Sequence, residues 1–471
     1  MNEVEWMSAS ELINAYQAKE VSPLEVTKHL FDRIEQLNPV LNAFVTLLAE
    51  SAESQARDAE QAYQKGTARA MEGVPIAVKD NIWSKGIRTT YGSKLYEDFV
   101  PDEDAVALER MKGAGAIVLG KTNLPEFGLI GITENPLFGK TANPWDMKRV
   151  CGGSSGGSAV AVAAGFCPVA MGNDGAGSIR IPSALCGVFG IKPHFGRIPW
   201  YPHIPGFDTL NHEGTITRTV EDAALFLDVA AGPDRRDFAS LPAYPGRFSD
   251  DMQGSVEGLR IAYSSDLGFA LAVDSEVLEL TRKAAFTFAE LGCQVEEIDD
   301  VLPATSEMDF IITMLSEVVA SNQERMQEIR EVSYKPYMPF LDLAGSFTNF
   351  DMAKINFHRY DLWKVVRKIF EGYDLLLTPS TACPAFECQD IGPLGPPSIE
   401  GVDVGPAGWV PFTIPFNFTG QPAASVPCGF NSEGLPVGLQ IVGDRFREAL
   451  VLKAAAALER AVPWRQYRPP V

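Results

Sequence analysis

Histidine is scarce in this chain of 471 residues, which contains five. They are His29, His194, His203, His212 and His358. A serine hydrolase of the common kind needs a histidine as its base, so this scarcity leaves few candidates. Positive charge is scarce too, because 40 lysines and arginines stand against 61 acidic residues and the net charge is −21. That balance opposes autonomous binding to nucleic acid or to anionic membranes, which both attract cationic surfaces.

Cysteine pairs and long apolar runs are also missing. The seven cysteines are scattered and form no CxxC pair, so we expect no metal site and instead free thiols in a reducing compartment. Cys383 and Cys388 are close enough in sequence to leave a disulfide open. The acidic N-terminus has no apolar core of a signal peptide, and no apolar run approaches about eighteen residues. We therefore expect a cytoplasmic protein with no membrane span.

What is present is the composition of a globular protein, with 46% hydrophobic and 21% charged residues. The first seventy residues read as helices, and Ser22, Pro23 and Glu25 form a capping box at the start of one of them. Strands and helices then alternate, which predicts an α/β fold with a large, mostly buried sheet. The strands are predicted at 74–78, 116–119, 259–263, 375–377 and 437–442, and helices at 41–65, 104–112, 158–164 and 447–460.

Two later segments are harder to assign. Residues 306–368 read as helical, and methionine and aromatic side chains recur along them, which is typical of core or a lid and also of an apolar substrate pocket. We favour core over pocket. Residues 393–415 are rich in glycine and proline and predict a long ordered loop. No linker separates independent domains, so we expect a single domain over residues 1–471.

Two glycine-rich stretches carry serines, at residues 152–158 and 175–180. Glycines let backbone N–H groups approach a reacting hydroxyl, as acyl transfer requires. The first stretch contains a GxSxG match around Ser154. A nucleophile elbow would need a strand before it and a histidine late in the chain. Residues 145–149 instead predict a polar loop, and His358 lies more than a hundred residues from the C-terminus, so we reject the elbow.

A neutral lysine can replace histidine as the base. Lys79 ends the apolar run of residues 74–78, which would carry it into the interior, where burial lowers the pKa of an amine. On spacing alone, the preferred interpretation is a structural lysine at a strand end that snorkels or pairs with Asp80, because apolar strands that end in Lys-Asp are common. The spacing by itself therefore does not identify Lys79 as a base.

Several longer motifs resemble the amidase signature family of serine amidohydrolases. They occur in the family's order and lie at residues 73–81, 120–123, 143–145, 152–158, 177–182, 190–193 and 434–440. The resemblance is dense from about residue 70 to 200 and returns near 405 to 460. It implies a large mixed central β-sheet covered by helices on both faces. It also implies N-terminal helices in 1–70, a signature core in 70–200 and a variable substrate-binding region at about 300–400.

The resemblance assigns roles to particular residues. It implies that Ser178 is the nucleophile, Ser154 a bridging serine preceded by a cis peptide bond, and Lys79 the base. The backbone N–H groups of Gly175, Ala176, Gly177 and Ser178 are then expected to hold the oxyanion. Asp174 and Arg180 flank this loop, and we favour a structural ion pair over direct catalysis. No cofactor and no metal are expected.

The function implied is an amidohydrolase that cleaves linear or cyclic amide C–N bonds through an acyl-enzyme. Aryl amides, carbamates (urethanes) and esters are further candidate substrates, and the partner is a small molecule. Residues 173–178, 412–417 and 420–422 are similar to the nylon-oligomer (6-aminohexanoate cyclic dimer) hydrolase branch. The alternatives are the glutaminase component of a tRNA-dependent amidotransferase and an inactive scaffold, which the intact triad disfavours. We expect a monomer or homodimer.

Overall fold

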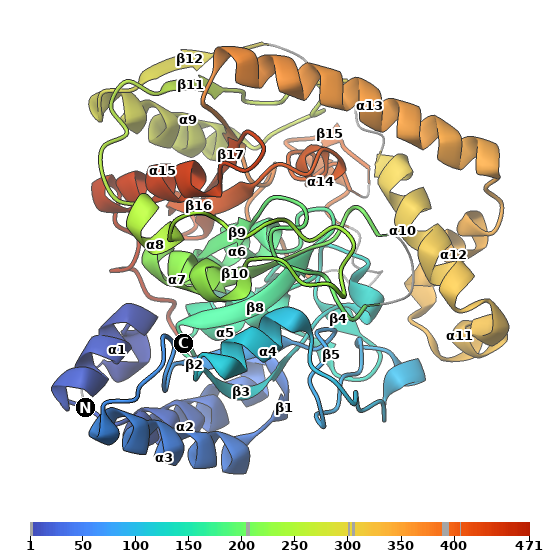
Figure 1. Ribbon diagram of the computed structural model, residues 1–471. Coiled ribbons are helices and arrows are strands. Elements are labelled where there is room, and N and C mark those ends of the chain that lie inside the picture. Colours follow the sequence, from blue (N-terminus) through green and yellow to red (C-terminus); the bar gives the residue numbers. More distant parts are fainter. Residues whose placement is uncertain (1–2, 204–207, 300–301, 304–306, 389–394, 406) are drawn as a thin grey trace.

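The computed structural model describes residues 3–203, 208–299, 302–303, 307–388, 395–405 and 407–471 (Figure 1). Residue 306 of the predicted helical segment, and residues 393, 394 and 406 of the predicted loop, lie outside the described residues. The fold is α/β and is built around one large mixed sheet, as the sequence predicts.

Eleven strands form this sheet, in the order β1-β3-β2-β8-β10-β9-β16-β17-β13-β11-β12. Strand β2 lies parallel to both β3 and β8, whereas β8 and β10 pair antiparallel. The strands are β1 (Phe44–Leu47), β2 (Pro75–Lys79), β3 (Ile117–Thr122), β8 (Val169–Asp174), β9 (Phe189–Lys192), β10 (His212–Thr217), β11 (Arg260–Tyr263), β12 (Gln294–Glu297), β13 (Leu375–Pro379), β16 (Ala423–Phe430) and β17 (Pro436–Gly443).

Helices cover both faces of the sheet (Figure 1). Neighbouring residues of one strand enter different cores because side chains alternate between faces: Ile76 and Val78 join one core cluster and Ala77 another. The helices are α1 (Ala9–Ala18), α2 (Pro23–Leu41), α3 (Ala49–Lys65), α4 (Val106–Gly113), α5 (Gly156–Ala163), α6 (Arg180–Cys186), α7 (Val220–Ala230), α8 (Phe248–Asp251), α9 (Ser275–Glu290), α10 (Glu307–Ser321), α11 (Met326–Val332), α12 (Met338–Ala344), α13 (Asn349–Gly372), α14 (Pro415–Phe418) and α15 (Glu448–Ala461). Among the helices of the described ranges, none combines the length and the apolar character needed to cross a bilayer.

The predicted capping box is present at the start of α2, where Ser22 Oγ accepts from Glu25 N and the Glu25 carboxylate accepts from Ser22 N. The helix predicted at 41–65 is wrong at its start. The edge strand β1 occupies Phe44–Leu47 before α3 begins, because these residues pair with β3. The strands β8, β9, β10, β12 and β16 were not among the predicted ones.

A second correction concerns residues 145–149, predicted to be a loop. They overlap the strand β7 (Asp146–Val150), which pairs with β6 (Ala142–Asn143) in a hairpin outside the large sheet. Two more small hairpins occur, β4 (Glu134–Asn135) with β5 (Gly139–Lys140) and β14 (Ser398–Ile399) with β15 (Val402–Asp403). The last of these lies inside the segment predicted as a long loop.

The segment from α10 to α13 is helical, as predicted, and α10 to α12 form a group at one end of the molecule (yellow and orange, Figure 1). Phe310 and Met314 of α10 pack against a core cluster that contains residues of the large sheet. Met326 and Met338 pack against a separate cluster that includes Phe127 and Leu315. These four side chains are therefore partly buried in apolar contacts, which agrees with the preference for core.

Candidate active site

Lys79 is the last residue of β2 and its side chain is completely buried. Its Nζ lies 2.7 Å from Ser154 Oγ and 2.6 Å from Asn173 Oδ1, with the Asn173 carbonyl oxygen at 3.5 Å. No carboxylate pairs with it in the described structure, so the expected alternative of a pair with Asp80 is not formed. Burial lowers the pKa of Lys79 to about 7, although Asp174 acts in the opposite direction. A large part of this amine is therefore neutral near pH 7.

Ser154 lies in the glycine loop that leads into α5, and its side chain is buried. The expected cis peptide bond is present between Gly153 and Ser154. The loop packs tightly against residues 128–133: an added Cβ on Gly153 would come within 2.9 Å of the Gly131 backbone, and one on Gly128 within 3.3 Å of Ser154 Oγ. A side chain at Gly153 would therefore need a shift of the Gly131 backbone, and Gly128, with φ at +73°, is in a conformation that favours glycine.

Ser178 lies between β8 and α6, in a loop whose Ala176 and Ser178 are only partly buried. Its carbonyl oxygen accepts a hydrogen bond of 3.1 Å from Ser155 N, which joins the two glycine stretches directly. Within the described residues, Ser178 Oγ makes no hydrogen bond, including none to Ser154 Oγ. The structure thus places the two serine-bearing stretches against each other, with Ser154 in contact with the buried lysine and the Ser178 hydroxyl without a hydrogen-bond partner among the described residues.

The backbone N–H groups of this loop differ in their partners. Gly177 N donates to Asp174 Oδ1 at 2.6 Å, so the expectation that this amide is free for an oxyanion is corrected. Glycine is required here because φ is +122° and an added Cβ would lie 2.4 Å from Thr413 Oγ1. The amides of Gly175, Ala176 and Ser178 have no hydrogen-bond partner among the described residues.

Asp174 and Arg180 form a completely buried ion pair, with Arg180 Nη2 2.9 Å from Asp174 Oδ1. Burial alone would raise the pKa of Asp174, but the guanidinium holds that pKa well below its ordinary value. Asp174 also accepts from the N–H groups of Gly177 and Ile179. The pair therefore braces the loop that carries Ser178, which is the structural role favoured from the sequence.

The histidines do not supply a base. His212 Nδ1 contacts the Leu210 carbonyl at 2.7 Å, and none of the five histidines hydrogen bonds to Ser154 or Ser178 in the described structure. His29 and His358 pair with Glu5 and Asp309, and His194 stacks on Phe446. A strand, β7, does precede the first glycine stretch, contrary to the expectation from the sequence. The arrangement still lacks the histidine that a nucleophile elbow at Ser154 would need.

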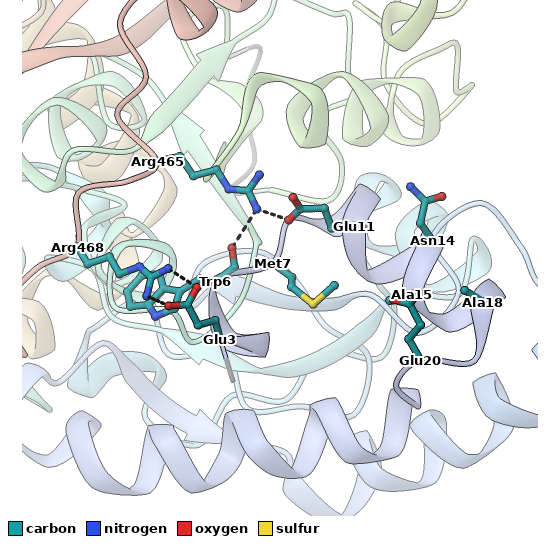
Figure 2. A pocket seen from close by; sticks show the side chains of 10 residues that line it. All are labelled: Glu3, Trp6, Met7, Glu11, Asn14, Ala15, Ala18, Glu20, Arg465 and Arg468. Carbon is teal, nitrogen blue, oxygen red and sulfur yellow. Dashed lines mark hydrogen bonds and ion pairs between the residues drawn. The ribbon is translucent and has the colours of Figure 1, made fainter. Parts of the chain in front are cut away.

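Cysteines and candidate metal ligands are dispersed in the described part of the chain. None of the seven cysteines is in a disulfide bond, so Cys383 and Cys388 are not joined to each other. The described part of the chain contains no group of His, Cys, Asp or Glu side chains arranged to hold a metal ion. A groove of about 520 Å³ lies between the N-terminal segment and the residues after α15, where Arg465 pairs with Glu11 and Arg468 with Glu3 (Figure 2). Its lining includes neither Lys79 nor either serine.

Sequence reasoning missed the polar residues around the lysine and the loop. Asn173 accepts from Lys79, and Asn81 pairs with Asn173. Asn417 donates to the carbonyl oxygen and to Oδ1 of Asp174, and Thr413 Oγ1 donates to the Ala176 carbonyl at 2.6 Å. Asn81 and Asn173 stood inside the motifs already singled out, but nothing in the sequence distinguished them from other polar loop residues.

A buried amine in contact with a serine, beside a loop with free amides, has the parts that serine-based acyl transfer requires. The amidase family profile matches residues 25–452. An acylamidase from Rhodococcus erythropolis is 36% identical over 468 residues, covering 98% of this chain and 97% of that protein. A glutamyl-tRNA(Gln) amidotransferase subunit from Geobacillus stearothermophilus is 35% identical over 489 residues, with 98% of each covered.

Solved structures give the same result. A bacterial aryl acylamidase of the amidase signature family superposes with a TM-score of 0.93 at 34% identity, covering 99% of this chain and 98% of that one. The substrate complex of 6-aminohexanoate cyclic dimer hydrolase gives 0.89 at 32% identity, with 99% of each chain covered. The chain therefore belongs to the amidase signature family, as predicted, and is an amide-hydrolysing enzyme.

Proposed function

We propose that this enzyme cleaves amides through an acyl-enzyme on Ser178, with Ser154 as proton relay and Lys79 as base. The observation that carries the proposal is the completely buried Lys79, 2.7 Å from Ser154 Oγ, with a pKa lowered to about 7. A lysine with its ordinary pKa of about 10.4 would be almost fully protonated at neutral pH and could not accept a proton.

The proposed reaction begins when neutral Lys79 takes the proton of Ser154 and Ser154 takes the proton of Ser178. Ser178 Oγ then attacks the amide carbonyl, and the amides of Gly175, Ala176 and Ser178 hold the oxyanion. The proton returns through Ser154 to the leaving nitrogen as the C–N bond breaks. Water next attacks the acyl-enzyme, giving its proton to the same relay, and releases the acid and free Ser178.

Apolar contacts near the loop support an apolar substrate. Ala176 packs against the same core cluster as Phe310 and Met314 of α10, within the region at about 300–400 that we propose varies with substrate. We propose aryl amides as the first class to test, with carbamates (urethanes) and esters as further substrates. The cytoplasmic location, the single domain and the monomeric or homodimeric state stay predictions.

The proposal is tested with the purified chain on a panel of an anilide, an alkyl amide, an aryl carbamate, an ester and glutamine. We expect the anilide to be cleaved without a partner protein, and Ser178→Ala to lose at least about a thousandfold in kcat, with no acyl-enzyme by mass spectrometry. Normal activity of Ser178→Ala would overturn the assignment. If glutamine is the one substrate that is cleaved, and its cleavage requires added partner proteins, the result would favour the function of the amidotransferase relatives.

A further inference from the structure

Two asparagine side chains form a pair beside the proposed base. Asn173, near the end of β8, accepts from Lys79 Nζ with its Oδ1 at 2.6 Å. Its Nδ2 donates to Asn81 Oδ1 at 2.9 Å, and Asn81 Nδ2 donates back to Asn173 Oδ1 at 3.4 Å. Asn173 is buried, and Asn81 follows Lys79 by two residues. The pair thus joins the ends of two adjacent strands directly over the amine.

The orientation of the Asn173 amide decides what the lysine can do. A side-chain amide has an oxygen that accepts and a nitrogen that donates. With Oδ1 toward Lys79, the amide accepts a hydrogen bond from one N–H of the amine. In the flipped orientation its Nδ2 would donate to the lone pair of a neutral amine and compete with Ser154. Asn81 Oδ1 accepts from Nδ2 on the far side and so opposes a flip of the Asn173 amide alone.

The contacts of Lys79 match those of a neutral amine in this orientation. Such an amine has two N–H groups and one lone pair. Asn173 offers two acceptors, its Oδ1 and its carbonyl oxygen, and Ser154 Oγ is the third contact. The lone pair is then left for the Ser154 hydroxyl. The one charged group that affects the pKa of Lys79 among the described residues is Asp174, which is itself paired with Arg180.

We propose that Asn81 is a positioning residue that acts through Asn173, fixing the amide so that the lone pair of Lys79 faces Ser154. The inference rests on the proposed role of Lys79 as base and adds two residues that set its direction. A merely structural pair would join the two strands and leave proton transfer unaffected. The chain offers such a pair for comparison: Asn135 Nδ2 donates to Asn123 Oδ1 at 2.6 Å, both residues are buried, and neither contacts Lys79.

The test compares pH profiles of kcat and KM for Asn81→Ala, Asn81→Asp and Asn135→Ala on a cleaved anilide. Asn81→Ala frees the Asn173 amide, so we expect kcat to fall about tenfold or more at every pH with KM unchanged. Asn81→Asp still accepts from Asn173 Nδ2, so kcat should recover at high pH. The negative charge of the new carboxylate stabilises the ammonium form of Lys79, so the midpoint of the pH profile of kcat should move upward by about one pH unit. Asn135→Ala should lower the unfolding midpoint without changing the profile.

The proposal is overturned if Asn81→Ala behaves like Asn135→Ala, or if the kcat of Asn81→Asp at high pH stays about tenfold or more below that of wild type. Because Asp is nearly isosteric with Asn, the second criterion also decides the matter if the alanine variant fails to fold. Failure of the proposed function gives a different result, since Ser178→Ala or Lys79→Met would then keep wild-type turnover.

Discussion

Two buried lysines lie near the ends of adjacent strands of the sheet, and only one of the two has the surroundings of a base. Lys79 ends β2 and Lys121 lies at the end of β3, and both side chains are completely buried. Lys121 pairs in register with Val78, so its side chain leaves the opposite face of the sheet from that of Lys79. Burial lowers the pKa of both, to about 7 for Lys79 and about 8 for Lys121.

The difference lies in the acceptors. Lys121 Nζ donates to the Ile82 carbonyl, to Ser84 Oγ at 2.8 Å and to Thr89 Oγ1 at 3.0 Å. Both hydroxyls give their own protons to carbonyl oxygens, Ser84 to Ile82 and Thr89 to Ile87. Lys121 therefore faces three acceptors, which suits an ammonium with three N–H groups.

Lys79 instead faces a serine whose proton has no other acceptor in the described structure, so it can receive that proton. The comparison teaches that burial alone does not make a lysine a base. The free proton of a neighbouring hydroxyl is needed as well.

The largest difference is expected when each lysine is replaced by methionine. Lys79→Met should lose at least about a thousandfold in kcat per folded molecule, because the base is removed. Lys121→Met should keep kcat in the folded fraction and lose about 2–4 kcal/mol of unfolding free energy, since three buried acceptors lose their donor. Steady-state kinetics and urea unfolding measure the two effects. A catalytic loss in Lys121→Met equal to that in Lys79→Met would break the distinction.

A smaller difference is expected for the serines that contact each lysine. Ser154→Ala interrupts the relay and should reduce kcat by about 10²–10⁴. Ser84→Ala removes one buried hydrogen bond to Lys121 and should cost about 1 kcal/mol of stability with little change in kcat. Thermal unfolding and turnover on the same preparations separate the effects. Near-normal turnover of Ser154→Ala would show that Lys79 acts without this serine.

The sequence predicted the fold class well because its strongest features are local. The capping box at Ser22 fixes the start of α2, and the apolar run 74–78 identifies β2. Strands such as β8 (VAMGND) were missed because their small and polar residues show neither alternation nor a β-branched run. Strand β1 was missed because pairing with β3, and not its own composition, makes it a strand.

The candidate site likewise combines features that the local sequence predicts with features that depend on tertiary contacts. The position of Lys79 at a strand end was visible in the sequence, whereas its role required the family resemblance, because spacing alone favoured a structural lysine that snorkels or pairs with Asp80. Asn173 could not be connected to Lys79 from sequence, since they lie 94 residues apart and meet only through the pairing of β2 with β8. The hydrogen bond from Gly177 to Asp174 depends on the same tertiary loop geometry, so the free amides could not be counted in advance.

The most direct test is the pH dependence of Ser178 acylation, measured as kcat/KM on an anilide in wild type and in Lys121→Met. Lys79 acts only when neutral and its pKa is lowered to about 7, so the rate should rise with pH, reach half its maximum near 7 and then level off. The midpoint should be unchanged in Lys121→Met. A profile that stays flat through neutral pH, or a midpoint near 8 that disappears in Lys121→Met, would contradict the assignment of Lys79 as the base.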